Sequence, residues 1–174
     1  MIQCLVFSDS HGRALSRMQR VIASHPEAQI VFFLGDGLSE AEALPPAFPD
    51  RTFLFVRGNC DFAPLYPTEE TDEITLEGVK LVFTHGHKYD AKLSLAGLRA
   101  LAARRGAGIC LFGHTHHQTQ EYCGEGDLPF TLFNPGSIGQ PDCGRPSYGV
   151  LTLSEGQYLL SIGFCNDENP NINL

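Results

Sequence analysis

Five short apolar runs, each ending abruptly in polar residues, constrain the fold of this chain of 174 residues more than any other feature. Runs of about four to eight apolar residues bounded by turn-forming residues are typical of buried β-strands. Each run is closely followed by a carboxylate, an amide or an imidazole side chain. The expected strands are Ile2–Phe7, Ile30–Leu34, Thr52–Val56, Val79–Phe83 and Ile109–Phe112.

Helical patterns lie between these runs. Apolar residues recur at helical spacing over Ala14–Ile22 and again over Leu93–Leu101. Pro26 marks the end of the first pattern, and Gly106 closes the second. Strands that alternate with helices predict an α/β domain with a largely buried sheet. In such sheets, ligands bind outside the carboxyl ends of the strands, where the polar residues of this chain lie.

The remaining segments complete a single expected domain over residues 1–174, since one domain takes about 150 residues. The Pro-rich stretch 44–49 is interpreted as a surface connection, and the polar tail Asn166–Leu174 as a frayed end. Two β-hairpins are also expected. They pair Asp72–Leu76 with Val79–Phe83, and Tyr148–Leu153 with Tyr158–Phe164.

Composition excludes several classes of protein. The 12 Lys and Arg residues are outnumbered by 20 Asp and Glu residues, so no stable nucleic-acid binding is expected. No apolar stretch approaches the roughly 18 residues of a membrane span, and the N-terminus has no signal-peptide pattern. The six cysteines form no C-x-x-C pair. We therefore expect a cytoplasmic protein with free thiols, in which a homo-oligomer is possible.

The polar residues at the strand ends are candidate ligands for divalent metal ions. Mixed oxygen and nitrogen ligands suit Mn, Fe, Zn, Ni or Co better than Mg or Ca, and the absence of thiolate argues against a structural zinc site. In Asp9-x-His11 and His114-x-His116, alternate residues of an extended segment would face one site. Asp36 is the best candidate to bridge two ions, because its glycine neighbours allow a close approach.

The order of these motifs resembles a known family. The series is Asp9-x-His11, Gly35-Asp36, Gly58-Asn59-x-Asp61, His85-Gly86-His87 and Gly113-His114-x-His116. It is similar to the calcineurin-like metallophosphoesterase superfamily. The short chain, Asn59-Cys60-Asp61 and Asn134-Pro135-Gly136-Ser137 resemble its small prokaryotic phosphodiesterase branch. The resemblance extends from Ile2 to about Val150.

This resemblance implies a four-layer αββα sandwich of two mixed β-sheets flanked by helices. It implies two divalent metal ions, with Mn as the first choice and Ni, Fe, Zn or Co as alternatives. One ion would take Asp9, His11 and His116, the other would take Asn59, His85 and His114, and Asp36 would join them. A metal-bound hydroxide would then hydrolyse a small phosphodiester or phosphoester substrate.

Other residues near these motifs are candidates for catalysis, together with Asn59. Many members of the superfamily have a histidine after the metal-binding Asn that is thought to protonate the leaving group, and here that position is Cys60. A thiol is a poorer proton donor than imidazole at neutral pH, which would favour substrates with good leaving groups. Asp61 either orients this region or forms a turn. His87 and His117 flank ligands and are candidates for substrate contact.

Alternatives remain at this stage. Taken singly, each ligand has a structural explanation; Asp9, for example, would cap a helix beginning near Arg13. The enzyme could also be a phosphomonoesterase or a nucleotide hydrolase of the same superfamily. A protein-interaction scaffold on this fold is the non-enzymatic alternative, although such relatives tend to lose metal ligands and this chain keeps all seven.

Overall fold

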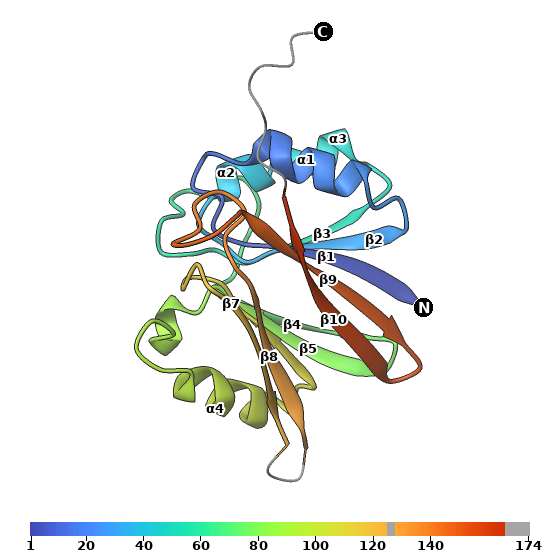
Figure 1. Ribbon diagram of the computed structural model, residues 1–174, viewed down its shortest axis with the longest axis vertical. Coiled ribbons are helices and arrows are strands. Elements are labelled where there is room, and N and C mark those ends of the chain that lie inside the picture. Colours follow the sequence, from blue (N-terminus) through green and yellow to red (C-terminus); the bar gives the residue numbers. More distant parts are fainter. Residues whose placement is uncertain (125–127, 166–174) are drawn as a thin grey trace, which may run out of the picture.

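Two five-stranded sheets form the centre of the protein in a computed structural model that describes residues 1–124 and 128–165 (Figure 1). The tail expected to be frayed, Asn166–Leu174, lies outside the described residues. The first sheet has the order β10 (Gln157–Phe164), β9 (Ser147–Ser154), β1 (Ile2–Phe7), β2 (Ala28–Phe33) and β3 (Thr52–Phe55). The second has the order β4 (Thr71–Leu76), β5 (Val79–Thr84), β6 (Ile109–Leu111), β8 (Phe130–Pro135) and β7 (Gln118–Cys123).

Both sheets are mixed and share one plan. In the first sheet β1, β2 and β3 are parallel, and β9 runs antiparallel to β1. In the second, β5, β6 and β8 are parallel, with antiparallel β4 and β7 at the two edges. Because parallel strands end at the same edge of a sheet, the loops after these strands gather at one end of the sandwich.

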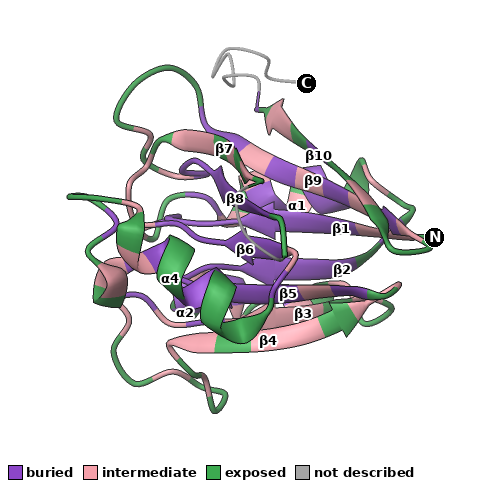
Figure 2. Ribbon diagram, turned by 90° about the horizontal axis from the view of Figure 1, so that it is seen from below, coloured by how far each residue is buried: buried purple, intermediate pink, exposed green. Residues whose placement is uncertain are grey.

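Four layers are stacked around three apolar cores. The largest core lies between the sheets and includes Phe32 from β2, Phe83 from β5 and Phe133 from β8. Helices α1 (Leu15–Ala23), α2 (Leu38–Ala41) and α3 (Leu44–Ala47) cover the outer face of the first sheet, and α4 (Ala96–Arg105) covers that of the second. The strands between these layers are mostly buried (Figure 2). The predicted αββα sandwich is confirmed.

The structure differs from the sequence-based expectations in three places. The stretch 44–49 is not merely a surface connection, since it contains α3 and its Leu44 is fully buried against the first sheet. Strands β7 and β8 were not expected. The second helix begins at Ala96, because Ser94 Oγ accepts the Ala96 amide hydrogen and the turn before it is not helical. Among the described residues, no helix is long and apolar enough to cross a membrane.

Candidate metal centre

The predicted ligands lie in loops at the carboxyl ends of five strands. Asp9 and His11 follow β1, and Asp36 follows β2. Asn59 follows β3, His85 follows β5, and His114 and His116 follow β6. Backbone hydrogen bonds join these loops, for example from the His11 amide to the Asp36 carbonyl (2.9 Å) and from the Gly113 amide to the His85 carbonyl (3.0 Å). The sheets therefore bring together the loops that carry the candidate ligands. The loops after these strands lie at one end of the sandwich (Figure 1).

Five of the predicted ligands have left-handed backbone conformations. They are Asp9, His11, Asp36, His114 and His116, with φ between 48° and 68°. Such conformations are uncommon for non-glycine residues and cluster at functional sites. The expectation that each pair would face one site as an extended segment was wrong in its reason, because the backbone of both pairs is not extended. Asp9 and His11 nevertheless share one group of ligand atoms, whereas His114 and His116 belong to two different groups.

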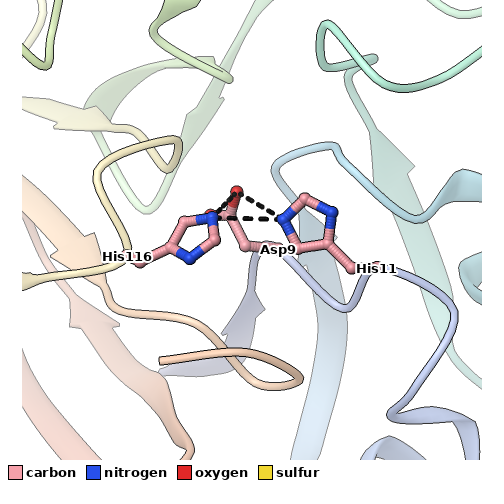
Figure 3. Close-up of side chains that lie close together, drawn as sticks. All are labelled: Asp9, His11 and His116. Atoms are coloured by element: carbon pink, nitrogen blue, oxygen red, sulfur yellow. Dashed lines mark hydrogen bonds and ion pairs between the residues drawn. The ribbon is translucent and has the colours of Figure 1, made fainter. Parts of the chain in front are cut away.

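The first group contains Asp9, His11 and His116 (Figure 3). The two Nε2 atoms of His11 and His116 are 3.1 Å apart. Asp9 Oδ1 lies 3.4 Å from His116 Nε2 and 3.9 Å from His11 Nε2. Ligands at about 2.1 Å from a common ion in tetrahedral or octahedral geometry are about 3.0–3.4 Å from one another. Two of these three separations fall in that range, so small adjustments would let all three side chains bind one ion.

The second group contains Asp36, His85 and His114. His85 Nε2 lies 3.3 Å from Asp36 Oδ2, without the alignment of a hydrogen bond. The ring centroids of His85 and His114 are 5.0 Å apart, and the ring planes meet at 65°. Asp36 also shares a third group with His11 and Cys60, and Asp9 Oδ1 is 3.9 Å from His85 Nε2. The two groups are therefore adjacent and joined through the two carboxylates.

Backbone carbonyls orient two of the imidazoles. His85 Nδ1 lies 2.7 Å from the Leu34 carbonyl at the end of β2, and His116 Nδ1 lies 2.6 Å from the Gln140 carbonyl. A carbonyl accepts a hydrogen, so Nδ1 carries the proton in each ring and Nε2 is left with its lone pair. Each Nε2 faces the centre. In metal sites, a hydrogen bond from the other ring nitrogen to a partner such as a carbonyl orients the metal-binding histidine in this way.

Hydrogen bonds among the described residues fix only one of the two oxygens of the Asp9 carboxylate. Oδ2 accepts hydrogen bonds from Ser8 Oγ (2.6 Å) and from the His114 amide (3.0 Å). The main-chain carbonyl of Asp9 accepts a hydrogen bond from Ser137 Oγ (2.6 Å). Asp9 does not cap α1, because Glu40 Oε1 accepts the Ala14 and Leu15 amide hydrogens at the start of that helix. This arrangement leaves Oδ1 directed into the centre.

Asp61 organises the backbone around Asp36. Its carboxylate accepts four amide hydrogens, from Asp36 (2.7 Å), Gly37 (2.8 Å), Leu38 (2.9 Å) and Gly58 (2.8 Å). A Cβ on Gly35 would lie 2.5 Å from the Gly58 nitrogen, so glycine is required for the two loops to approach this closely. These contacts favour an orienting role for Asp61 over direct contact with substrate.

The other residues proposed for catalysis are less buried. Asn59 is exposed, and its Nδ2 donates to Cys60 Sγ (3.2 Å). Cys60 is exposed as well, and its amide donates to Asp36 Oδ1 (2.8 Å). The His87 ring lies 5.4 Å from that of His85 and 6.1 Å from that of His114. The catalytic roles of these residues stay predictions.

The carboxylates and imidazoles shift each other's pKa values in the metal-free protein. Burial would raise the pKa of Asp36, but the facing His85 and the Cys60 amide lower it well below its usual range. Burial opposes protonation of His85, yet Asp36 and Asp9 raise the pKa of this imidazole. Burial and the nearby His85 lower the pKa of His114 to about 4. Burial and Asp36 raise the pKa of the Cys60 thiol to about 11.

Two atoms show that a divalent ion fits this centre. Asp9 Oδ1 and His85 Nε2 are buried and have no hydrogen-bond partner in the described part of the chain. A buried polar atom without a partner costs about 1–3 kcal/mol, and native proteins keep few of them. Because both atoms are typical metal ligands and lie 3.9 Å apart, cations bound to the two adjacent groups would satisfy them.

Sequence reasoning missed several residues that build the centre. Asn134 Nδ2 donates to the Gly113 carbonyl (2.8 Å) and to Thr115 Oγ1 (3.1 Å), so it holds the loop that carries His114. The sequence predicted Asn134 in a tight loop beside the site, but Asn134 lies in strand β8, and its hydrogen bonds to the loop of His114 were not predicted. Asp142 contacts His116 Nδ1 at 3.5 Å and His117 Nε2 at 3.4 Å. No spacing pattern connects these residues with the ligands they support.

The double-sheet sandwich with carboxylates and imidazoles at its strand ends matches the arrangement that the sequence predicted for a metallophosphoesterase. The model of the calcineurin-like phosphoesterase superfamily domain matches residues 2–156. The probable metallophosphoesterase YsnB of Bacillus subtilis (strain 168) is 37% identical over 150 residues, which cover 86% of this chain and 83% of that protein. The chain belongs to the calcineurin-like phosphoesterase superfamily.

Solved structures agree with this family. A conserved uncharacterized protein of Streptococcus pneumoniae TIGR4, described as a predicted phosphoesterase, has a TM-score of 0.76 and 27% identity over 94% of this chain and 89% of that one. Two more distant structures share the fold. Vps29 of Entamoeba histolytica in complex with Zn²⁺ has a TM-score of 0.72 and 20% identity, covering 94% of this chain and 99% of its own. An archaeal phosphodiesterase has a TM-score of 0.70 and 18% identity, covering 92% and 99%.

Proposed function

We propose that this chain is a metal-dependent phosphodiesterase that hydrolyses small phosphodiesters at a binuclear centre. Asp9, His11 and His116 would bind one ion, and His85, His114 and Asn59 would bind the other. Asp36 would bridge the ions. It shares one group of ligand atoms with His11 and another with His85 and His114, as a bridging residue must. The observation that carries the proposal is the pair of buried, unpartnered atoms, Asp9 Oδ1 and His85 Nε2, 3.9 Å apart between the two groups.

Charge explains why an acidic protein would need these ions. The formal net charge of -8 repels a phosphate anion, whereas two divalent ions bring more positive charge than Asp9 and Asp36 remove. When bound, the ions supply Lewis acidity toward the phosphoryl oxygens and lower the pKa of water. The protein's own part is to present Nε2 of His85 and His116 as neutral donors and to keep Asp36 ionised, which its lowered pKa does.

The surroundings of the centre favour a diester over a monoester. A monoester carries close to two negative charges at neutral pH and a diester carries one, so monoesters profit more from extra cations. Two of the basic side chains close to site residues in the sequence, Arg57 and Lys88, both contact Glu70, at 3.6 Å and 3.5 Å. Their charge is partly cancelled. The thiol of Cys60 in place of an imidazole further favours diesters with good leaving groups.

Mixed oxygen and nitrogen ligands suit manganese, nickel, iron, zinc or cobalt, and we propose manganese as the native metal, as the family resemblance implies. The six cysteines are free, and a reducing cytoplasm would keep Cys60 and Cys143, the two exposed ones, in this state. We propose a cytoplasmic enzyme on this basis.

The proposal is tested with protein stripped by a chelator and then supplied with Mn²⁺, Zn²⁺, Co²⁺ or Ni²⁺. Hydrolysis of bis(p-nitrophenyl) phosphate is compared with that of p-nitrophenyl phosphate. We expect metal-dependent cleavage that is faster for the diester. Faster cleavage of the monoester would replace the proposal with a phosphomonoesterase. A folded protein that cleaves neither substrate with any of the metals would favour a scaffold.

A further inference from the structure

A cavity of about 490 Å³ lies beside the metal centre. Thr115 and His117, which line it, belong to the loop that carries the ligands His114 and His116. Asp142, on the same cavity, contacts the ring of His116. Ligand pockets commonly measure about 300–1,000 Å³, so this cavity has room for a group of nucleoside size.

Lys92 is the lining side chain with a full positive charge. It is exposed, and its ammonium has no carboxylate partner among the described residues. Neighbouring Lys88, in contrast, lies 3.5 Å from Glu70. Lys92 is also close enough to the centre for its charge to act on the His114 imidazole. An unpaired cation beside an acidic protein's metal centre is suited to hold an anionic group of the substrate.

The rest of the cavity suits a polyhydroxyl compound. Asp142 is exposed at the cavity, with its two oxygens 3.5 Å from His116 Nδ1 and 3.4 Å from His117 Nε2. Thr119 contributes a hydroxyl, and Ala91 and Leu95 contribute an apolar wall. Carboxylate and hydroxyl oxygens accept hydrogens from sugar hydroxyls, while apolar side chains pack against carbon atoms.

We propose that this cavity binds one alcohol group of the diester, and that Lys92 selects alcohols that carry a second phosphate. The preferred substrate class is therefore a phosphodiester of a phosphorylated sugar or nucleoside. This inference rests on the proposed function, since the metal centre would hold the scissile phosphoryl group while the cavity holds its substituent. Lys92 is a specificity-determining residue here, remote from the reacting atoms.

A matched pair of substrates tests this inference. Thymidine 5′-(p-nitrophenyl phosphate) and its 3′-phosphorylated counterpart have the same leaving group and differ only in the second phosphate. We expect the 3′-phosphate to lower KM about threefold to tenfold at low ionic strength, which is the effect of one partly exposed charge pair. Added salt should reduce this difference in KM, because it screens the charges. Lys92→Gln should abolish the difference in KM between the two thymidine substrates. Lys88→Gln, the matched control, should keep it.

Binding without turnover gives a second readout. Calorimetry on the metal-loaded protein compares thymidine 3′,5′-bisphosphate with thymidine 5′-monophosphate. The bisphosphate should bind more tightly to the wild type and to Lys88→Gln but not to Lys92→Gln. Equal affinities in the wild type, or a preference that survives Lys92→Gln, would overturn the inference. Because bis(p-nitrophenyl) phosphate tests hydrolysis separately, failure of that reaction alone would count against the proposed function and not against the cavity.

Discussion

The two groups of candidate ligands differ most in how many of their members are buried. In the group of Asp36, His85 and His114, the His85 side chain is 0% exposed, that of Asp36 is 3% exposed, and His114 is half-buried. In the group of Asp9, His11 and His116, Asp9 is equally buried, but the imidazoles are 21% and 12% exposed. We call these the buried group and the open group.

Their supports differ as well. His85 of the buried group is oriented by the Leu34 carbonyl at the end of a core strand, and Asp36 is fixed through the Asp61 network. His116 of the open group is oriented by the Gln140 carbonyl, in the loop after β8. Strand ends bordered by packed side chains are more rigid than loops at the surface. The buried group is therefore the better preorganised for an ion, whereas the imidazoles of the open group are more accessible to solvent.

The largest expected effect comes from substitution of Asp36. Asp36 shares ligand atoms with His85 and His114 of the buried group and with His11 of the open group. Asp36→Asn should lower kcat/KM for bis(p-nitrophenyl) phosphate at least about a thousandfold, since the loss of an outer partner alone costs about 10–100-fold. Asp50→Asn, an exposed carboxylate beside Arg51, is the matched control. A decrease of less than tenfold in kcat/KM for Asp36→Asn would contradict the proposal that Asp36 links the two groups.

Asp61 should stabilise the buried group more than any surface residue does. Asp61→Ala leaves four backbone amides without their carboxylate acceptor, and we expect the free energy of unfolding of the metal-free protein to fall by about 3 kcal/mol or more. Urea unfolding measures this difference. A loss below about 1 kcal/mol would instead be typical of a simple turn residue.

Histidine titration in the metal-free protein sharpens the contrast. Contact with Asp9 raises the pKa of His116, whereas burial and His85 lower that of His114 to about 4. His116 therefore stabilises the fold below its ordinary pKa and loses this contribution as the pH rises through its folded value. His114 destabilises the fold as the pH falls from its ordinary pKa toward about 4. NMR of the imidazole Cε1–H signals should show His116 titrating at a higher pH than His114, and the reverse order would contradict the assignment.

The smallest expected effect concerns Cys60, at the exposed border of the centre. Cys60→His should raise kcat about tenfold for diesters with an alkyl leaving group, because imidazole is the better proton donor at neutral pH. Bis(p-nitrophenyl) phosphate, with its good leaving group, serves as the control and should change little. An equal change in kcat for both substrates would show that residue 60 affects the geometry of the site and does not act as the proton donor.

Much of the fold follows from local sequence patterns. The strand over Ile2–Phe7 has the bounds expected from its apolar run. Strand β7 was missed because it lies at a sheet edge and its sequence is mostly polar, so no apolar run marks it. Helix α3 was missed because two prolines near its start resemble a loop, although proline is tolerated in the first turn of a helix.

The metal centre was also only partly predictable from the sequence. The ligand types and their positions after strands are visible in the sequence, as for His85 after β5. The groups that orient them are backbone carbonyls and side chains that are distant in sequence, such as the Leu34 carbonyl and Asn134. Such contacts depend on how the two sheets pack, and no spacing rule along one chain encodes them.

The binuclear centre is tested most directly by titrating the stripped protein with Mn²⁺ and recording electron paramagnetic resonance spectra. We predict two ions bound per chain, with an exchange-coupled spectrum that develops as the second ion binds, because the two groups share carboxylates. His116→Ala, which truncates the open group, should bind one ion and show no coupling. Saturation of the wild type at one ion per chain, or two ions without coupling, would contradict the account.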